Sequence, residues 1–153
     1  MSAKLRTFKI EVPVNYDQAW ADAIRQGAPN SNTGSYIWNV EDQFPKEKGT
    51  ITEKLRFVQF GSSFYHQVVL DYAKEEKIAH IHPRSIFATT EKHPKLADEQ
   101  DEDYMYLNSG LTCTVDGSVL VPLVVCSRDG HRDAYADDVR YEFHRYSWFG
   151  FRE

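Results

Sequence analysis

The segment Ser118–Ser127 constrains the fold more than any other part of the sequence. It contains the longest apolar run of the chain, eight residues from position 119 to position 126, with apolar side chains at both odd and even positions. Successive side chains of a strand point to opposite faces of a sheet, so this strand must be covered on both faces. The preceding Asp116-Gly117 step predicts a long hairpin over residues 104–127. Because Pro122 lacks an N–H group, it predicts a bulge or an unpaired edge position.

The first half of the chain alternates strand and helix patterns. Residues 7–14 alternate apolar and mostly polar or charged side chains, which predicts a half-buried strand. Helical spacing over residues 16–27 predicts a helix that Asn15 or Asp17 caps and that Gly27 ends. A second strand is predicted at residues 50–60, followed by a helix at about 64–76 that Ser62 or Ser63 caps.

The remaining segments complete the expected domain. Residues 36–40 predict a short strand, and Pro83 predicts the first turn of a helix that runs to about residue 92. The acidic stretch 98–103 predicts a solvated helix end or loop, residues 128–138 a polar loop, and residues 139–148 a final strand. We therefore expect one α+β domain over residues 1–153, with an N-terminal βα unit and central helices packed on a C-terminal, mainly antiparallel sheet.

The two cysteines are predicted to be reduced and packed as small apolar residues. In the expected hairpin Cys113 faces Leu120 and Cys126 faces Leu107, which separates the thiols by on the order of 20 Å. A disulfide requires Cα atoms within about 7 Å of one another. Neither cysteine has a CxxC neighbour, which argues against zinc binding or redox chemistry.

Charge and hydropathy exclude several classes of protein. The formal net charge is −5, which argues against a general nucleic-acid binder, because phosphate contacts need a positive surface. No apolar run approaches the roughly 20 residues of a membrane-spanning helix, and no apolar signal core follows the first charged residues. We therefore expect a cytoplasmic protein without nucleic-acid or membrane partners.

A pair of histidines raises the alternative of a metal site. His80 and His82 stand two residues apart, so on a strand they would share a face and could hold a metal together with a carboxylate. Glu142 and His144 form a similar pair. Nothing in the sequence brings the two pairs together, and no third ligand is placed by spacing. A metal-assisted hydrolase built on His80 and His82 remains an alternative hypothesis.

The polar stretch 128–138 and the aromatic C-terminus favour a binding surface. Loops held on a rigid sheet are common places for binding residues, and aromatic side chains with polar tips add rigid contact area. The residues that we expect near a contact surface are Arg128, Asp129, His131, Arg132, Tyr135 and Trp148.

No catalytic motif accompanies these features. The sequence has no Gly-x-Ser-x-Gly elbow, and Gly61-Ser62-Ser63 lacks the lysine of a phosphate loop. We therefore expect a non-enzymatic binding or interaction module without a cofactor, whose partner is a protein or a small molecule. A structural or homo-oligomerising protein is a further alternative, with self-contact through an edge strand beside Pro122 or through the C-terminal aromatics.

Short motifs along most of the chain carry a resemblance. They include Ile37-Trp38-Asn39-Val40, Leu55-Arg-Phe-Val-Gln-Phe-Gly61, Asp116-Gly-Ser-Val-Leu-Val-Pro122 and Trp148-Phe-Gly-Phe-Arg152. In this order they are similar to a set of small uncharacterised bacterial proteins that are frequent in candidate-phylum genomes, a set that implies no activity or site residue. More loosely, Pro83 before a β-rich half that ends in Gly150-Phe151-Arg152 resembles C-type-lectin-like and formylglycine-generating-enzyme-like domains, which implies a lectin-like binding scaffold.

Overall fold

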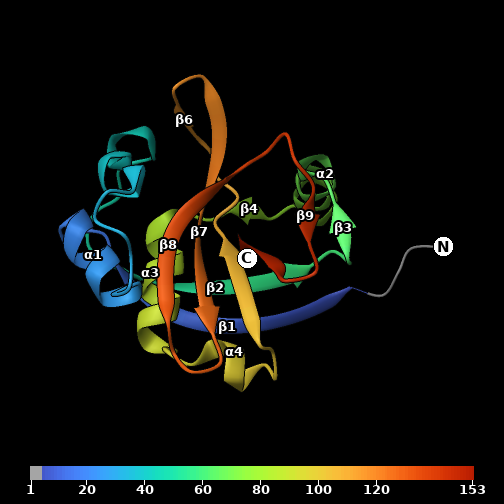
Figure 1. Cartoon of the computed structure of the whole chain (residues 1–153), viewed down its shortest axis with the longest axis horizontal. Coiled ribbons are helices and arrows are strands. Elements are labelled where there is room, and N and C mark those ends of the chain that lie inside the picture. The colour runs from blue at the N-terminus through green and yellow to red at the C-terminus, as the bar shows by residue number, and fades with distance from the viewer. Residues whose placement is uncertain (1–4) are drawn as a thin grey trace.

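An eight-stranded, mostly antiparallel sheet forms the centre of the fold (Figure 1). The structure is a computed structural model, and it describes residues 5–153. The main order is β1 (Arg6–Asn15), β2 (Thr50–Gln59), β10 (Ser147–Arg152), β5 (Tyr104–Asn108), β7 (Ser118–Ser127) and β6 (Cys113–Val115), while β4 (Ala79–His80) pairs with β10 and β8 (Arg132–Asp138) pairs with β7. Strands β10 and β5 run parallel to each other, and the remaining pairs of named strands are antiparallel. The predicted α+β class is confirmed.

Separate layers cover the two faces of the sheet. Helices α1 (Trp20–Gly27), α3 (Pro83–Lys92) and α4 (Leu96–Glu99) pack on one face, where Phe57 and Trp148 belong to the larger buried cluster. Helix α2 (His66–Glu76) and the small ribbon of β3 (Ser63–Phe64) and β9 (Phe143–His144) cover the other face, which buries Val58 and Phe149. Figure 1 shows α1 and α3 on one side of the view and α2 on the other. Within residues 5–153, no helix combines the length and the apolar character needed to cross a membrane.

Strand β7 occupies the covered position that its composition predicts. It lies between β8 on one side and β5 and β6 on the other, and residues 120–124 are buried. The carbonyl of Pro122 accepts a hydrogen bond from the Ser109 N–H at 3.0 Å, so the side of Pro122 without an N–H faces the break between β5 and β6. The predicted bulge or unpaired edge position is therefore wrong: Pro122 lies inside the sheet opposite Ala136 of β8, and the break between β5 and β6 accommodates its missing N–H.

The break between β5 and β6 also changes the predicted register. Cys113 faces Leu120 as expected, but Cys126 faces Met105 instead of Leu107. A hairpin with an unbroken first strand would keep one register throughout, whereas the interrupting residues 109–112 shift it. Both thiols are buried and free, as predicted, and burial raises the pKa of Cys126 to about 12.

The prediction of a polar loop over residues 128–138 is wrong for most of its length. Residues 132–138 form β8, which pairs with β7 along its whole length. The segment 28–35 covers part of the outer edge of β8: the backbone N–H of Arg132 donates to the Asn30 side chain, and that of Ala134 donates to Ser31 Oγ, both at 2.9 Å. A strand at a sheet edge tolerates polar side chains on its open face, so its composition resembles that of a loop.

Two further segments, residues 36–43 and 143–152, differ from the predictions. Residues 36–39 form a 3-10 helix, η1 (Tyr36–Asn39), capped by Ser35, and η2 (Glu41–Gln43) follows, so the short strand predicted there is wrong. The final strand is also shifted, because residues 143–144 form β9 and β10 begins only at Ser147. The C-terminal aromatic string therefore lies in the middle of the sheet (Figure 1).

The predicted helix caps are wrong at two of the three long helices. The Asn15 side chain accepts the Asp17 N–H and Asp17 accepts the Gly49 N–H, so both residues shape a turn before α1 instead of capping it. Ser63 belongs to β3 and its hydroxyl donates to Glu142, while α2 begins at residue 66. The prediction for Pro83 is confirmed, because it forms the first residue of α3.

Gly27 allows α1 and α3 to touch through their backbones. It is the last residue of α1, so the helix ends where the sequence predicts, and a Cβ atom added there would be 2.3 Å from the Phe87 carbonyl oxygen and 2.6 Å from the Phe87 Cα. The glycine is therefore also needed for close helix packing.

We expect Gly27→Ala to lower the free energy of unfolding by about 1–3 kcal/mol, because α1 must move away from the α3 backbone. The measurement is urea denaturation followed by circular dichroism. Gly34→Ala is the control, since a Cβ there meets only the tip of the Asn32 side chain at 3.3 Å. Equal midpoints for Gly27→Ala and the native chain would contradict the role of this contact.

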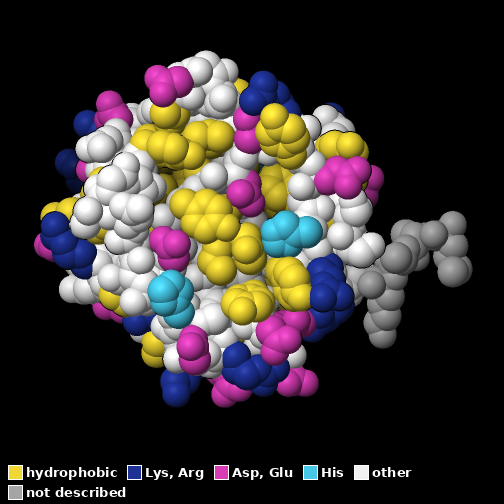
Figure 2. Space-filling model, viewed as in Figure 1, with side chains coloured by type: hydrophobic (Ala, Val, Ile, Leu, Met, Phe, Trp, Pro, Cys, Tyr) yellow, Lys and Arg dark blue, Asp and Glu magenta, His cyan; other side chains and the backbone are white. Residues whose placement is uncertain are grey.

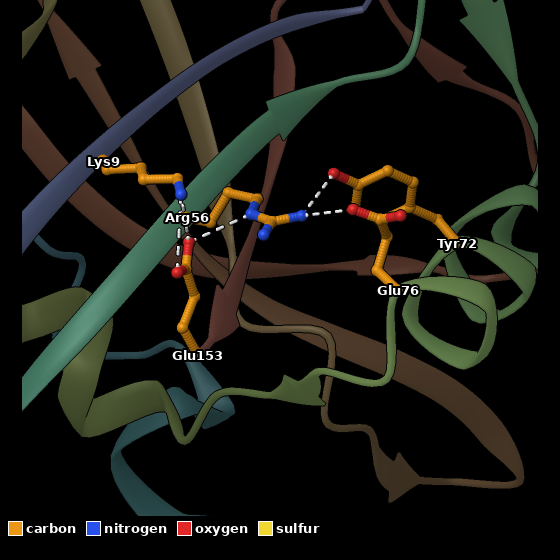
Figure 3. A network of polar contacts seen from close by, with 5 residues as sticks. All are labelled: Lys9, Arg56, Tyr72, Glu76 and Glu153. Atoms are coloured by element: carbon orange, nitrogen blue, oxygen red, sulfur yellow. Dashed lines mark hydrogen bonds and ion pairs between the residues drawn. The ribbon is translucent and has the colours of Figure 1, made fainter.

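Arg56 connects α2 to the sheet and to the C-terminal residue (Figure 3). Its guanidinium donates to the Tyr72 hydroxyl at 3.0 Å and to Glu76 at 2.7 Å, both on α2. Its Nε donates to Glu153 at 3.1 Å, and Lys9 Nζ lies 3.1 Å from the same carboxylate. One largely buried side chain thus joins β1, β2, α2 and the chain end.

We predict that Arg56→Gln lowers the free energy of unfolding by about 1–2 kcal/mol, because the amide cannot replace three charge-assisted contacts. This corresponds to a Tm decrease of roughly 3–6 °C. Thermal unfolding measures the effect, with Lys54→Gln on the same strand as the control for loss of one positive charge. Comparable Tm values for the two variants would show that the network adds nothing to stability.

Candidate functional site

The open face of β8 carries an alternating acidic and aromatic pattern. Asp133, Tyr135 and Asp137 occupy every second position of the strand and therefore share one face, while Ala134 and Ala136 pack against the larger core. Figure 2 shows aromatic, acidic and histidine side chains gathered in the centre of this side of the molecule. The pattern places titratable groups on a rigid, paired strand.

A pocket of about 320 Å³ lies beside this face, between β8, β5 and the segment that leads to β9. The Tyr106 ring is nearly perpendicular to two neighbouring rings of the pocket. Its centroid lies 4.5 Å from that of His144, with an interplanar angle of 89°. Its centroid lies 6.3 Å from that of Tyr135, with an interplanar angle of 84°. Its lining includes three carboxylates and neither lysine nor arginine. The lining residues are Tyr106, Tyr135, Asp137, Asp138, Tyr141, Glu142, Phe143 and His144.

The three carboxylates of the pocket have different surroundings. Arg140 binds Asp138 at 2.7 Å and lowers the pKa of that carboxyl. Ser63 and Tyr65 donate to Glu142 and lower its pKa as well. Asp137 has no side-chain hydrogen bond from any residue that the structure describes, and burial raises its pKa. Asp137 is therefore a partly desolvated carboxylate without a side-chain partner in the described part of the chain.

His144 and Tyr135 are both neutral near pH 7. Burial lowers the pKa of His144, although the nearby Asp137 opposes this shift. His144 Nδ1 accepts the Tyr146 N–H at 3.2 Å, so the ring proton resides on Nε2. Burial and the Tyr106 hydroxyl raise the pKa of Tyr135, which keeps its phenol protonated. The pocket combines phenol O–H donors, an imidazole N–H donor, aromatic rings and the Asp137 carboxylate, which has no side-chain partner among the described residues.

Of the residues expected at a contact surface, Tyr135 lies in this pocket and Arg132 does not. The Arg132 guanidinium donates to the carbonyls of Thr90 at 2.7 Å, Gln26 at 3.2 Å and Gly27 at 3.3 Å. It thereby joins the ends of α1 and α3 to β8. Trp148 is 2% exposed and lies in the larger core, where it offers no surface to a ligand.

The other expected residues lie in the turn before β8, outside the pocket. Arg128 forms ion pairs with Asp98 at 3.1 Å and Asp101 at 3.0 Å. The Asp129 carboxylate accepts hydrogen bonds from the Ser127 hydroxyl and from the His131 N–H, which shapes the turn. The His131 side chain is exposed. These residues remain candidates for a peripheral contact, but the pocket does not include them.

Sequence reasoning misses Tyr106, Asp137 and Tyr141 as members of one site. The alternation of Asp133, Tyr135 and Asp137 with two alanines is the signal that could have indicated an edge strand with a polar open face. Tyr106 joins the site because β5 and β8 both pair with β7, so that only one strand lies between them. No local sequence pattern indicates this arrangement.

The structure gives His80 and His82 different surroundings. His82 caps α3: its Nδ1 accepts the Arg84 N–H at 3.0 Å, and its Nε2 lies 3.1 Å from the Pro45 carbonyl. The His80 ring packs against Phe151, with ring centroids 5.7 Å apart. Within residues 5–153, no group of three or more His, Cys, Asp or Glu side chains is arranged to hold a metal ion. The geometry therefore adds no support for the hydrolase hypothesis.

A second cleft, of about 360 Å³, lies beside His82, and its lining includes Tyr16. Behind it the buried Glu53 carboxylate accepts hydrogen bonds from the Tyr16 hydroxyl and the Ser85 hydroxyl, each at 2.5 Å. Burial and this carboxylate raise the pKa of Tyr16. Arg84 is paired with Glu41. The buried polar groups of this cleft are thus bonded to one another, which indicates a structural role.

Comparisons of the chain with protein-family models, curated proteins and solved structures return no match. The resemblance of the sequence to small bacterial proteins and to lectin-like domains therefore stays a prediction.

The buried ring of His82 predicts a pH dependence of stability. Burial and the adjacent Arg84 lower its pKa to about 4, below the ordinary value of 6.5, so the unfolded chain takes up the proton first. The His82 contribution is fully present above about pH 6.5 and is lost as the pH falls toward 4, by up to about 3 kcal/mol. We expect His82→Asn, whose side-chain oxygen can replace Nδ1 as the acceptor that caps α3, to reduce the pH dependence of the free energy of unfolding over this range.

The measurement is urea denaturation between pH 4 and pH 7.5. His131→Asn is the matched control, because the His131 side chain is exposed. A slope in His82→Asn as steep as that of the native chain would show that another group causes the pH dependence.

Proposed function

We propose that this chain is a non-enzymatic binding module whose ligand occupies the pocket beside β8. One observation carries the proposal: the Asp137 carboxylate is partly desolvated, lies among aromatic rings and has no hydrogen-bond partner among residues 5–153. Burying a charge without a partner costs free energy, so such a group is a candidate for contact with a ligand.

The scaffold around the pocket favours binding of a defined ligand. Tyr135 and Asp137 stand on a strand whose partners in β7 are Leu123 and Val121, both buried. Tyr106 stands on β5, which also pairs with β7. Side chains that project from paired strands lose little conformational entropy when a ligand binds, and tyrosine combines a large apolar surface with a polar tip.

The chemistry of the lining fits binding better than covalent catalysis. Its eight residues include none of the hydroxyl, thiol or amine nucleophiles Ser, Thr, Cys and Lys. Carboxylates can also act as nucleophiles, but Asp138 is paired with Arg140 and Glu142 is hydrogen-bonded to Ser63. Acid–base chemistry between Asp137 and His144 would require a substrate bond within reach of both groups, and only their mutual electrostatic influence supports it. The binding function requires only the observed cavity and its free carboxylate.

Two further proposals concern the setting of the protein. We propose a cytoplasmic location, supported by two buried and unpaired thiols. Pro122 lies between neighbouring strands and provides no edge for self-association. The free edge of β1 carries Pro13, and Lys92 covers the Glu11 carbonyl, both of which oppose edge pairing. Homo-oligomerisation stays a prediction that light scattering tests.

A fragment screen by NMR tests the proposed function. The probes are small alkylammonium ions, methyl glycosides and short carboxylates, at millimolar concentration. We expect at least one class to shift amide signals of Tyr106, Tyr135, Asp137 and His144 together, and Tyr135→Ala to weaken that binding at least tenfold, because it removes one wall of the pocket.

Tyr104→Ala provides the matched control, because Tyr104 is 50% exposed and lies outside the lining. Circular dichroism verifies that both variants are folded. The proposal fails when no probe shifts the pocket signals, or when Tyr135→Ala binds the active probe as well as the native chain does.

A further inference from the structure

We infer that the pocket beside β8 binds an organic cation, with a quaternary ammonium head group against Asp137 and the tyrosine rings. The inference rests on the proposed function and adds the chemical class of the ligand. Three properties of the pocket lead to it: its charge, the orientation of its rings and its size.

The negative charge of the pocket favours a positively charged ligand. Asp138 is neutralised by Arg140, which contacts both of its carboxylate oxygens, and Glu142 is hydrogen-bonded to Ser63. Asp137 has no comparable partner among residues 5–153, and the neighbouring His144 has a lowered pKa and is neutral near pH 7. A ligand with one positive charge would compensate the remaining carboxylate where the protein itself does not.

The aromatic rings add a second, independent preference for positive charge. The faces of tyrosine rings carry partial negative charge and attract a cation within about 6 Å of the ring centroid. The Tyr106 ring stands nearly perpendicular to that of Tyr135, and Tyr141, which is 65% exposed, lines the opening. The Arg140 guanidinium already lies 5.5 Å from the Tyr141 ring centroid, so this ring has a cation partner within the chain and the inferred ligand contact relies on Tyr106 and Tyr135.

Size and hydration favour a methylated ammonium over a metal ion or a primary amine. The cavity of about 320 Å³ is near the lower limit of ligand pockets and suits a compact head group. A metal ion needs several ligand oxygens, whereas Asp137 is the one carboxylate of the lining without a partner among the described residues. A quaternary ammonium requires no hydrogen-bond acceptors and loses little hydration when it enters an aromatic pocket.

The test compares choline with 3,3-dimethyl-1-butanol, which has the same shape but no charge. Amide shifts are titrated with each compound at pH 7.5 and low ionic strength. We expect choline to bind at least tenfold more tightly than the neutral compound, with shifts at Tyr106, Tyr135 and Asp137. N-acetyl-trimethyllysine amide is titrated in parallel: tighter binding than choline assigns the head group to a protein side chain, and tighter binding of choline assigns it to a free metabolite. Both results support the inference.

Variants separate the local carboxylate from the general negative charge of the surface. We expect Asp137→Asn to weaken choline binding at least tenfold, while Asp133→Asn, which removes the same charge from the same strand face outside the lining, changes it less than threefold. Tyr135→Phe keeps the ring and should bind nearly as the native chain does, whereas Tyr135→Leu should lose most of the affinity. Equal effects of the two aspartate variants would overturn the inference.

The outcomes distinguish this inference from the proposed function. Two results would overturn the inference of a cationic ligand and leave the proposed binding function in place. One is equal affinity for choline and dimethylbutanol, and the other is binding of a methyl glycoside at the pocket without binding of choline. Absence of pocket shifts with every probe, charged or neutral, overturns the binding function and the inference together.

Discussion

Burial of both faces of the central strands is the constraint on which the rest of the structure depends. In β10, Trp148 points into the core under α1, α3 and α4, while Phe149 and Phe151 point into the core under α2. Gly150 leaves room for Ile81, which a Cβ atom would approach to 2.3 Å. Since β7 is covered in the same way, the chain must supply helices for one face and a helix with a small ribbon for the other.

The position of the candidate site follows from this arrangement. Both faces of the central strands are covered by other elements, so polar side chains can gather only where this cover is incomplete. Strand β8, at the margin of the sheet, is such a place. The residues of β8 divide their roles accordingly. Arg132 joins the strand to the ends of α1 and α3, and Tyr135 and Asp137 face the pocket. A strand that pairs with β7 along its whole length can therefore present a carboxylate without a described side-chain partner and keep its register.

Two carboxylates contrast a structural role with the binding role that we propose. Glu53 is almost fully buried, and two hydroxyl groups at 2.5 Å stabilise it, so its burial is compensated inside the protein. Asp137 is less buried, yet no described side chain compensates it. A compensated group belongs to the scaffold, whereas an uncompensated group retains binding free energy for a ligand.

The sequence by itself determined the α+β class, β1, β2, the two-sided β7, the helix that begins at Pro83 and the two free thiols, because each depends on local periodicity or on one residue's geometry. It did not determine β8, the break opposite Pro122 or the central place of β10, since these depend on which distant strand lies alongside. Tyr135 is recognisable from the sequence as a surface aromatic. Only the tertiary structure brings it together with Tyr106, Asp137 and His144, because pairing across β7 places side chains from β5, β8 and β9 around one cavity.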